Sequence, residues 1–190
     1  MRLRDSDRTW GWVTRFLHWT MAGIIFFMLG LGTYMANFVE DPLEQFPLVQ
    51  LHKSWGFLIF GLAVFRILWR LGNRRKPDLP DAMSALEKLA ARLGHLGLYL
   101  LIFAMPISGW LMASASPLQD AFGIKNKFFG LFEVYDPFKP GSKELTDLFA
   151  QVHFYCAIAL AALLIAHIGA ALLHHLAKGD DVLKRMTYGS

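Results

Sequence analysis

All seven histidines lie within long apolar stretches of the chain, where an imidazole is costly unless it has a partner, and four of them are singled out by their spacing. His153 and His167 share one stretch and are fourteen residues apart. In a helix this spacing is about 21 Å along the axis and nearly one face, since fourteen steps of about 100° fall about 40° short of whole turns. His18 and His52 begin two other stretches. Imidazoles in apolar stretches can serve as ligands of a metal or of a metal-containing cofactor. Because His153 and His167 lie at two different depths of the membrane, each would need a second histidine at its own depth.

The elements that must carry these histidines are membrane helices. The chain has 190 residues, 55% of them hydrophobic, and a mean hydropathy of +0.37, which is unusual for a soluble domain of this size. None of the apolar stretches shows the alternation of a barrel strand. Each has the ~20 residues that a helix needs to cross a ~30 Å hydrocarbon core. The sequence therefore predicts an all-α integral membrane four-helix bundle, a single domain over 1–190, with spans at roughly 15–36, 49–71, 91–113 and 149–176.

The cations predict the orientation of this bundle. Thirteen lysines and arginines lie in the N-terminal segment, the second loop and the C-terminal tail, whereas the first and third loops contain five. Because loops rich in lysine and arginine stay in the cytoplasm, both termini are expected there, with a long periplasmic loop at 114–148. The net charge of +4 thus reflects topology and not nucleic-acid binding. The first span is too long for a signal peptide and is expected to be retained, as in a multi-pass protein of a bacterial inner membrane.

Alternating helix directions then pair the histidines. His18 begins a helix that runs outward and lies at the cytoplasmic level with His167, while His52 begins a helix that runs inward and lies at the outer level with His153. Two pairs at two depths within a bundle are the ligand sets of two low-spin b-type haems. His18 is therefore predicted to be an axial ligand.

Other interpretations of these histidines remain open. Any one of them can be a packed or interfacial histidine, and His95 can compete as the inner ligand. Zinc is disfavoured because two imidazoles without a nearby carboxylate or thiolate are too few for a structural site. The single cysteine, Cys156, can form neither an internal disulfide nor the CxxCH attachment of a c-type haem, and is interpreted as a packing residue.

Further residues are candidates for contacts to the cofactors. Arg66 lies fourteen residues after His52, hence at the inner level, where it can meet a haem propionate or snorkel to the interface. Lys53, next to His52, is the corresponding candidate for contact with a propionate of the outer haem. His174 lies seven residues beyond the inner ligand and is a candidate quinone contact or proton donor, or an interfacial histidine. Glycines that can admit a helix or a porphyrin are Gly56, Gly61, Gly97 and Gly109.

Together these motifs carry a family resemblance. The stretches "RFLHW", "LHKSWGFLIFGLAVFRILWR", "LGHLGLYLLIFAMPISGWL" and "VHFYCAIALAALLIAHIGAALLHH" followed by "DDVLKRM" resemble the bacterial cytochrome b561 family over nearly the whole chain. The resemblance implies a transmembrane dihaem protein that exchanges electrons with ubiquinone, with axial ligands at His18, His52, His153 and His167. One branch of that family oxidises superoxide in the periplasm and reduces quinone.

Two functions follow as expectations. The first is a quinone-linked oxidoreductase that takes electrons from a periplasmic donor such as superoxide. The alternative is a haem-b membrane anchor and electron relay for a separate periplasmic dehydrogenase or lipid-binding partner, which would dock on residues 114–147. Lysines of the long loop, Lys125, Lys127, Lys139 and Lys143, can attract an anion, but five acidic residues there favour a solvated loop of mixed charge. The third interpretation is a four-helix membrane protein whose histidines bind no cofactor.

Overall fold

The computed structural model describes residues 2–80, 82–138 and 140–188. Four helices within these ranges are long and apolar enough to cross a bilayer, so the predicted four-helix membrane bundle is confirmed. They are α1 (Trp12–Asn37), α2 (Pro42–Gly72), α3 (Ala85–Ser114) and α5 (Lys143–Leu176). The short elements are α4 (Pro117–Phe122), β1 (Lys127–Phe128), β2 (Phe132–Glu133) and α6 (Val182–Thr187).

Each long helix contains one of the predicted apolar stretches and extends beyond it. α2 begins at Pro42 because Asp41 caps it: the carboxylate accepts from the backbone N–H of Leu43 at 2.8 Å. α3 begins with a capping box between Ser84 and Glu87. α5 begins behind Ser142, whose hydroxyl accepts from a backbone N–H of the first turn. The predicted spans are shorter than the helices because hydropathy detects only the apolar part of a helix, and these capped ends are polar.

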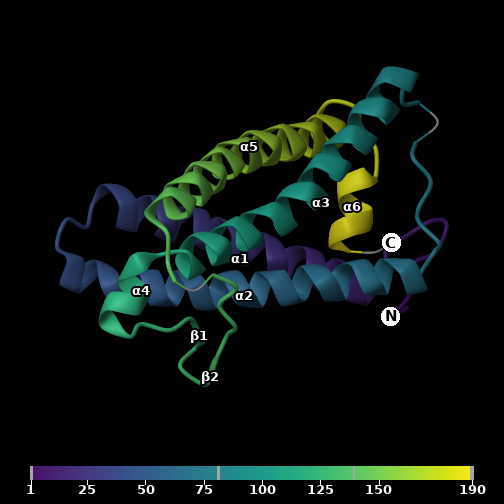
Figure 1. The fold of residues 1–190 in the computed structure, drawn as a ribbon. Helices are drawn as coiled ribbons and strands as arrows, with labels where there is room; N and C mark the ends of the chain where they lie inside the picture. Colours follow the sequence, from purple (N-terminus) through teal and green to yellow (C-terminus); the bar gives the residue numbers. More distant parts are fainter. Residues whose placement is uncertain (1, 81, 139, 189–190) are drawn as a thin grey trace.

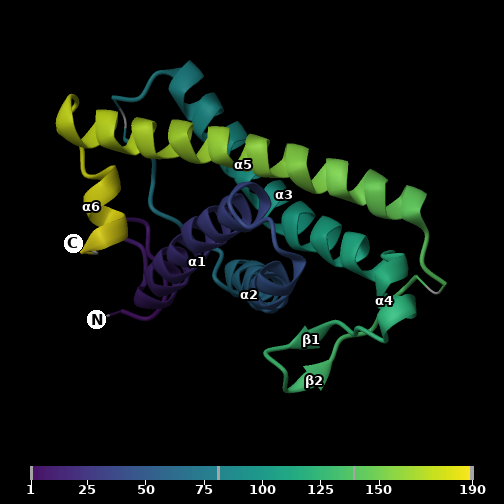
Figure 2. The same ribbon diagram turned by 90° about the vertical axis from the view of Figure 1, so that its left-hand side faces the viewer.

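The helices pack in pairs, α1 with α2 and α3 with α5, and α2 also contacts α3 (Figures 1 and 2). The buried core is small and is formed by Met21, Ile59, Ala63 and Ile102. Large apolar side chains such as Ile165, 74% exposed, cover the outside of the bundle. A surface of this kind fits a protein whose outer solvent is lipid.

The bundle has two different ends. Residues near both ends of the chain gather at one end, which we call the terminal end (Figure 1). The connection between α1 and α2 lies at the other, the loop end, together with α4 and the β1–β2 hairpin. The hairpin is antiparallel, with Lys127 opposite Glu133 and Phe128 opposite Phe132. The long third loop is therefore folded over much of its length.

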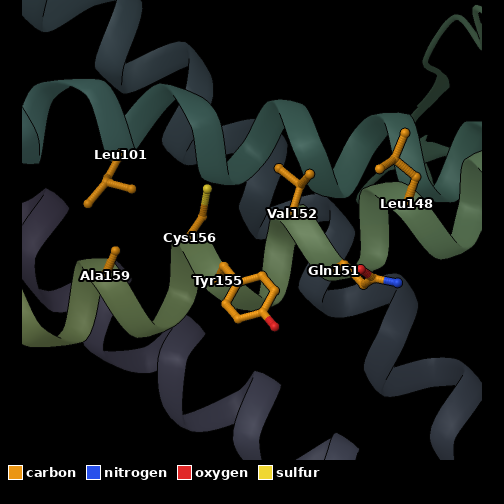
Figure 3. A pocket seen from close by; sticks show the side chains of 7 residues that line it. All are labelled: Leu101, Leu148, Gln151, Val152, Tyr155, Cys156 and Ala159. Carbon is orange, nitrogen blue, oxygen red and sulfur yellow. The ribbon is translucent and has the colours of Figure 1, made fainter.

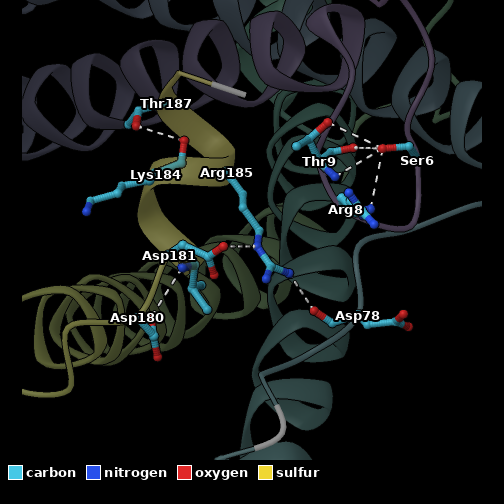
Figure 4. Close-up of polar contacts among 10 residues, drawn as sticks. Ser6, Arg8, Thr9, Asp78, Asp180, Asp181, Lys184, Arg185 and Thr187 are labelled. Atoms are coloured by element: carbon cyan, nitrogen blue, oxygen red, sulfur yellow. Dashed lines mark hydrogen bonds and ion pairs between the residues drawn. The ribbon is translucent and has the colours of Figure 1, made fainter. Parts of the chain in front are cut away.

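At the terminal end, α6 folds back on the first helix. The Arg15 guanidinium donates to the carbonyl of Thr187 at 3.0 Å, and the Trp19 indole donates to that of Met186 at 3.1 Å. Arg185 forms an ion pair with Asp181 and donates to the carbonyl of Asp78 in the α2–α3 connection (Figure 4). α6 thus joins three segments that are distant in the sequence.

Candidate functional site

At the loop end, the structure brings His52 of α2 next to His153 of α5. Their ring centres are 6.2 Å apart and the ring planes are inclined by 78°. Both rings line a cavity of about 560 Å³, whose walls are mainly apolar and come from all four long helices and α4. The predicted outer pair therefore faces an interior space of the bundle.

At the terminal end, His18 of α1 lies next to His167 of α5, with ring centres 6.3 Å apart and planes inclined by 61°. His95 of α3 also contacts His167, at a shorter separation of 5.4 Å. Its Nδ1 lies 2.6 Å from the carbonyl oxygen of Ala91, one turn earlier in the same helix. The structure thus gathers three histidines here, two of them with the spacing of the outer pair.

The ring spacing tests whether these residues fit a haem. An imidazole nitrogen binds a first-row metal at about 2 Å, and the ring centre is about 1 Å farther away. Two rings on opposite sides of one metal are therefore separated by about 6 Å. The two predicted pairs, at 6.2 and 6.3 Å, fit this separation, and His95 with His167 is too close. Among the described residues, no group of three or more His, Cys, Asp or Glu side chains is arranged to hold a metal ion by itself.

Two glycines make room for the outer pair. A Cβ at Gly109 of α3 would lie 3.1 Å from Cε1 of His153, and one at Gly32 of α1 would lie 3.3 Å from Cε1 of His52. Of the glycines singled out in the sequence, Gly97 faces Leu163 at a close approach of α3 and α5, while Gly61 has open space around it. Gly109 thus admits an imidazole, a role that its position in the sequence did not reveal.

The proton position on His153 is fixed by α3. Its Nδ1 lies 3.1 Å from the carbonyl oxygen of Met105 and 3.0 Å from the hydroxyl of Ser108, which itself donates to that carbonyl at 2.9 Å. Because the Ser108 hydroxyl uses its proton for the Met105 carbonyl, both neighbouring oxygens can only accept a hydrogen bond from the ring. Nδ1 therefore carries the proton, and Nε2 is free to bind a metal. In contrast, the buried Nδ1 of His52 has no hydrogen-bond partner in the described part of the chain. Ser108 escaped the sequence analysis because a lone serine in an apolar helix has no spacing signal.

Arg66 points to the inner pair. Its guanidinium lies 3.4 Å from Nδ1 of His18 and 3.9 Å from the sulfur of Met21, and it covers the ring of Tyr99 at 5.5 Å. The side chain is therefore held inside the bundle beside a histidine, in preference to the snorkelling alternative. A guanidinium in this place is suited to an anionic group of a bound cofactor.

The cations at the loop end are distributed unevenly. Lys53 lines the cavity beside His52, and it is the cavity's only lysine or arginine among the described residues. Lys125 pairs with Glu133 at 2.7 Å, and Lys143 pairs with Asp147 at 2.6 Å. Lys139 lies outside the described residues. The loop is thus of mixed charge, and the cation that reaches the predicted outer site is Lys53.

His174 is buried at the end of α5, where its Nδ1 lies 2.5 Å from a carboxylate oxygen of Asp180. The backbone N–H of Asp180 also donates to the carbonyl of His174 at 3.2 Å. The pair fixes the turn between α5 and α6. It also couples a buried imidazole to a carboxylate, an arrangement that can hold or pass on a proton.

The outer face of α3 and α5 carries a separate groove of about 380 Å³, formed by Leu101 of α3 and side chains of α5 (Figure 3). Cys156 and Tyr155 line it. Cys156 is half-buried among apolar neighbours, in agreement with a packing residue, and none of the described histidines lines the groove.

Several known proteins are similar to this chain over most of its length. "Cytochrome b561 homolog 2" of Escherichia coli K12 is 34% identical over 188 residues, covering 98% of this chain and 95% of that protein. "Cytochrome b561 homolog 1" of the same organism is 26% identical and covers 90% and 92%. The "Probable superoxide oxidase CybB" of Yersinia pestis is 29% identical over 72% of each chain. The family described as prokaryotic cytochrome b561 matches residues 9–189. The chain therefore belongs to the prokaryotic cytochrome b561 family of haem-b-binding, multi-pass membrane proteins that transfer electrons.

Proposed function

We propose that the protein holds two haem b groups, one between His52 and His153 and one between His18 and His167, and transfers electrons across the membrane. The observation that carries this proposal is the equal spacing of the two ring pairs, 6.2 and 6.3 Å, at two levels of one bundle. Each bound haem supplies a reversible one-electron couple. The fourteen residues between His153 and His167 separate the two levels by about 21 Å, most of the thickness of the hydrocarbon core.

The side chains around each pair have separable tasks. Met105 and Ser108 orient His153, while Gly32 and Gly109 leave room for the two outer rings. A metal held by two imidazoles at each level would have no open position for a substrate, so donor and acceptor would have to approach the edge of each site.

Two cations balance the charge of the bound groups. Arg66, beside His18, is placed to hold a propionate at the inner level, and Lys53, on the cavity wall, to hold one at the outer level. Both lie within apolar helices, where an unpaired cation is costly, and an anionic partner offsets that cost.

We assign the terminal end of the bundle to the cytoplasm and the loop end to the periplasm of a bacterium, with the chain in the inner membrane. The excess of lysine and arginine at the terminal end supports this orientation. A reporter fused after Ser190, which lies outside the described residues, tests it. A reporter that is active only in the cytoplasm should work there, and activity of a periplasm-only reporter would contradict the assignment.

For the substrates we propose superoxide, or another periplasmic one-electron donor, and membrane ubiquinone. In the balanced reaction, two superoxide anions each lose one electron to give two O₂, and ubiquinone takes up two electrons and two protons to give ubiquinol. The name of the Yersinia pestis relative supports the donor, as does Lys53 facing the outer cavity. His174, paired with Asp180 at the terminal end, supports proton delivery to quinone near the inner pair.

Stopped-flow absorbance of the purified protein tests this function. The haem content should be two per chain, superoxide should reduce both haems, and a short-chain ubiquinone should reoxidise them. Reduction by a chemical reductant but not by superoxide would remove superoxide as the donor and favour the relay for a separate periplasmic protein. One haem per chain, or none, would contradict the assignment of the histidine pairs.

A further inference from the structure

The tip of the β1–β2 hairpin is apolar, and its charges are confined to the stem. Residues 128–132 read Phe-Phe-Gly-Leu-Phe, with no charged or hydrogen-bonding side chain. Leu131 is 77% exposed and Phe132 is 58% exposed. The charged residues lie just outside this run, at Lys125, Lys127 and Glu133, and Lys125 pairs with Glu133. A patch of this kind marks contact with a protein or with a membrane and not with water.

The hairpin is fastened to the side of α2. The buried hydroxyl of Ser54 accepts from the backbone N–H of Phe129 at 3.0 Å and lies 3.2 Å from the carbonyl oxygen of Lys127. The ring of Phe129 packs edge-on against Trp55, with ring centres 5.5 Å apart. Figure 2 shows both strands outside the bundle, on the side away from α5. The tip is therefore held in place beside α2 and faces outward.

The level of this attachment places the tip beside the membrane-spanning part of α2. Ser54 lies twelve residues after the start of α2 at Pro42, which is about 18 Å along the helix axis. It is also two residues beyond His52 and five residues inside the apolar stretch that begins at residue 49. A loop standing in the water above the bundle would have to attach nearer to the first turns of α2.

We propose that residues 128–132 insert into the outer part of the bilayer, so that the hairpin is an interfacial membrane anchor alongside the outer histidine pair. Phe and Leu are among the side chains that interfacial segments bury at this boundary, and the pair of charges at the stem remains in the headgroup region. A two-stranded hairpin leaves backbone N–H and C=O groups without strand partners at its edges. The hairpin therefore cannot lie in the middle of the hydrocarbon, but it can lie at the boundary, where water satisfies these groups. Lipid is thus the partner that covers the exposed apolar tip.

Single labels in proteoliposomes of phosphatidylcholine test the proposal on the haem-loaded protein. In a Cys156→Ala background, Leu131→Cys and Phe132→Cys each carry a nitroxide, and its collisions with O₂ and with a water-soluble nickel chelate are measured. Ile165→Cys, on the exposed apolar face of α5, is the lipid reference. Lys143→Cys, at the exposed first residue of α5, is the aqueous reference. Only variants that keep the parent haem spectrum are compared.

We expect labels at 131 and 132 to collide with the nickel chelate several-fold less often than the label at 143, and with O₂ more often. As a second measurement without a label, a membrane-impermeant maleimide should react several-fold more slowly at 131 than at 143 in proteoliposomes, and equally at both in SDS. If residues 131 and 132 behave like residue 143 in either measurement, the tip lies in water, the proposal is wrong, and the patch is a surface for a protein partner. The haem spectrum, which tests the proposed function, is read independently of these results.

Discussion

Replacing Gly109 by alanine should weaken the binding of the outer haem while leaving the inner one in place. The new Cβ would lie 3.1 Å from Cε1 and 3.3 Å from Nδ1 of His153. Non-bonded carbon atoms prefer about 3.5–4.0 Å, so the ring must retreat by about 0.4 Å or more. It has little freedom to do so, because Met105 and Ser108 hold its Nδ1 from the same helix.

The size of the effect follows from this displacement. Overpacking of a filled site costs about 1–3 kcal/mol, and each 1.4 kcal/mol is about a tenfold change in affinity. The affinity for the outer haem should therefore fall between several-fold and roughly a hundredfold. A ligand shifted by about 0.5 Å is also at the limit of productive geometry.

The assay is the haem content per chain, measured as the pyridine haemochrome, together with the reduced-minus-oxidised spectrum. Gly109→Ala should retain fewer than two haems per chain and show a weaker or shifted component of the alpha band. Gly94→Ala is the matched control, since it makes the same substitution in the same helix, where nothing lies within 4 Å of the new Cβ. Two haems with unchanged spectra in Gly109→Ala would refute the reasoning.

The remaining predictions concern the ligands and the residues that support them. His52→Ala should remove the outer haem and His18→Ala the inner one, and a variant that keeps both haems with unchanged spectra would break the assigned pairing. Ser108→Ala removes one hydrogen-bond acceptor from Nδ1 of His153, a contact worth about 1 kcal/mol. The midpoint potential of the outer haem should therefore rise by about 40 mV while the haem content stays unchanged. A redox titration without such a shift would exclude the positioning role of Ser108. His174→Gln should leave haem content and donor-driven reduction intact but slow reoxidation by ubiquinone in stopped-flow traces, whereas a normal reoxidation rate would place the quinone elsewhere, next to the outer haem.

The helical periodicity of the sequence predicted much of this arrangement. The fourteen-residue spacing within α5 and the alternation of helix direction indicated which histidines share a level, and the structure places His18 beside His167 and His52 beside His153. Both rules depend only on the rise of a helix and the need to cross a bilayer. That these four residues bind haem iron remains a prediction.

Contacts between helices could not be predicted in this way. Gly109 and Ser108 act on an imidazole that is more than forty residues away in the sequence, and neither residue type has a periodic signal. The pairing of His174 with Asp180 depends on how the chain turns after α5. The attachment of the hairpin depends on Ser54 and Trp55 of α2, which meet residues more than seventy positions away in the sequence. Such contacts arise from tertiary packing, which a pattern of apolar residues does not specify.

The contacts of α6 with α1 have a consequence for the order of biosynthesis. Residues 186 and 187 supply the acceptors for Trp19 and Arg15 across 167 and 172 positions of the chain. At a synthesis rate of about 5–20 residues per second, α1 waits roughly 8–35 seconds for them after it leaves the ribosome. During that time the other three long helices are made and enter the membrane. The terminal end therefore closes only after the whole bundle has been translated, and a ribosome that stalls before α6 leaves an α1 that lacks these two partners.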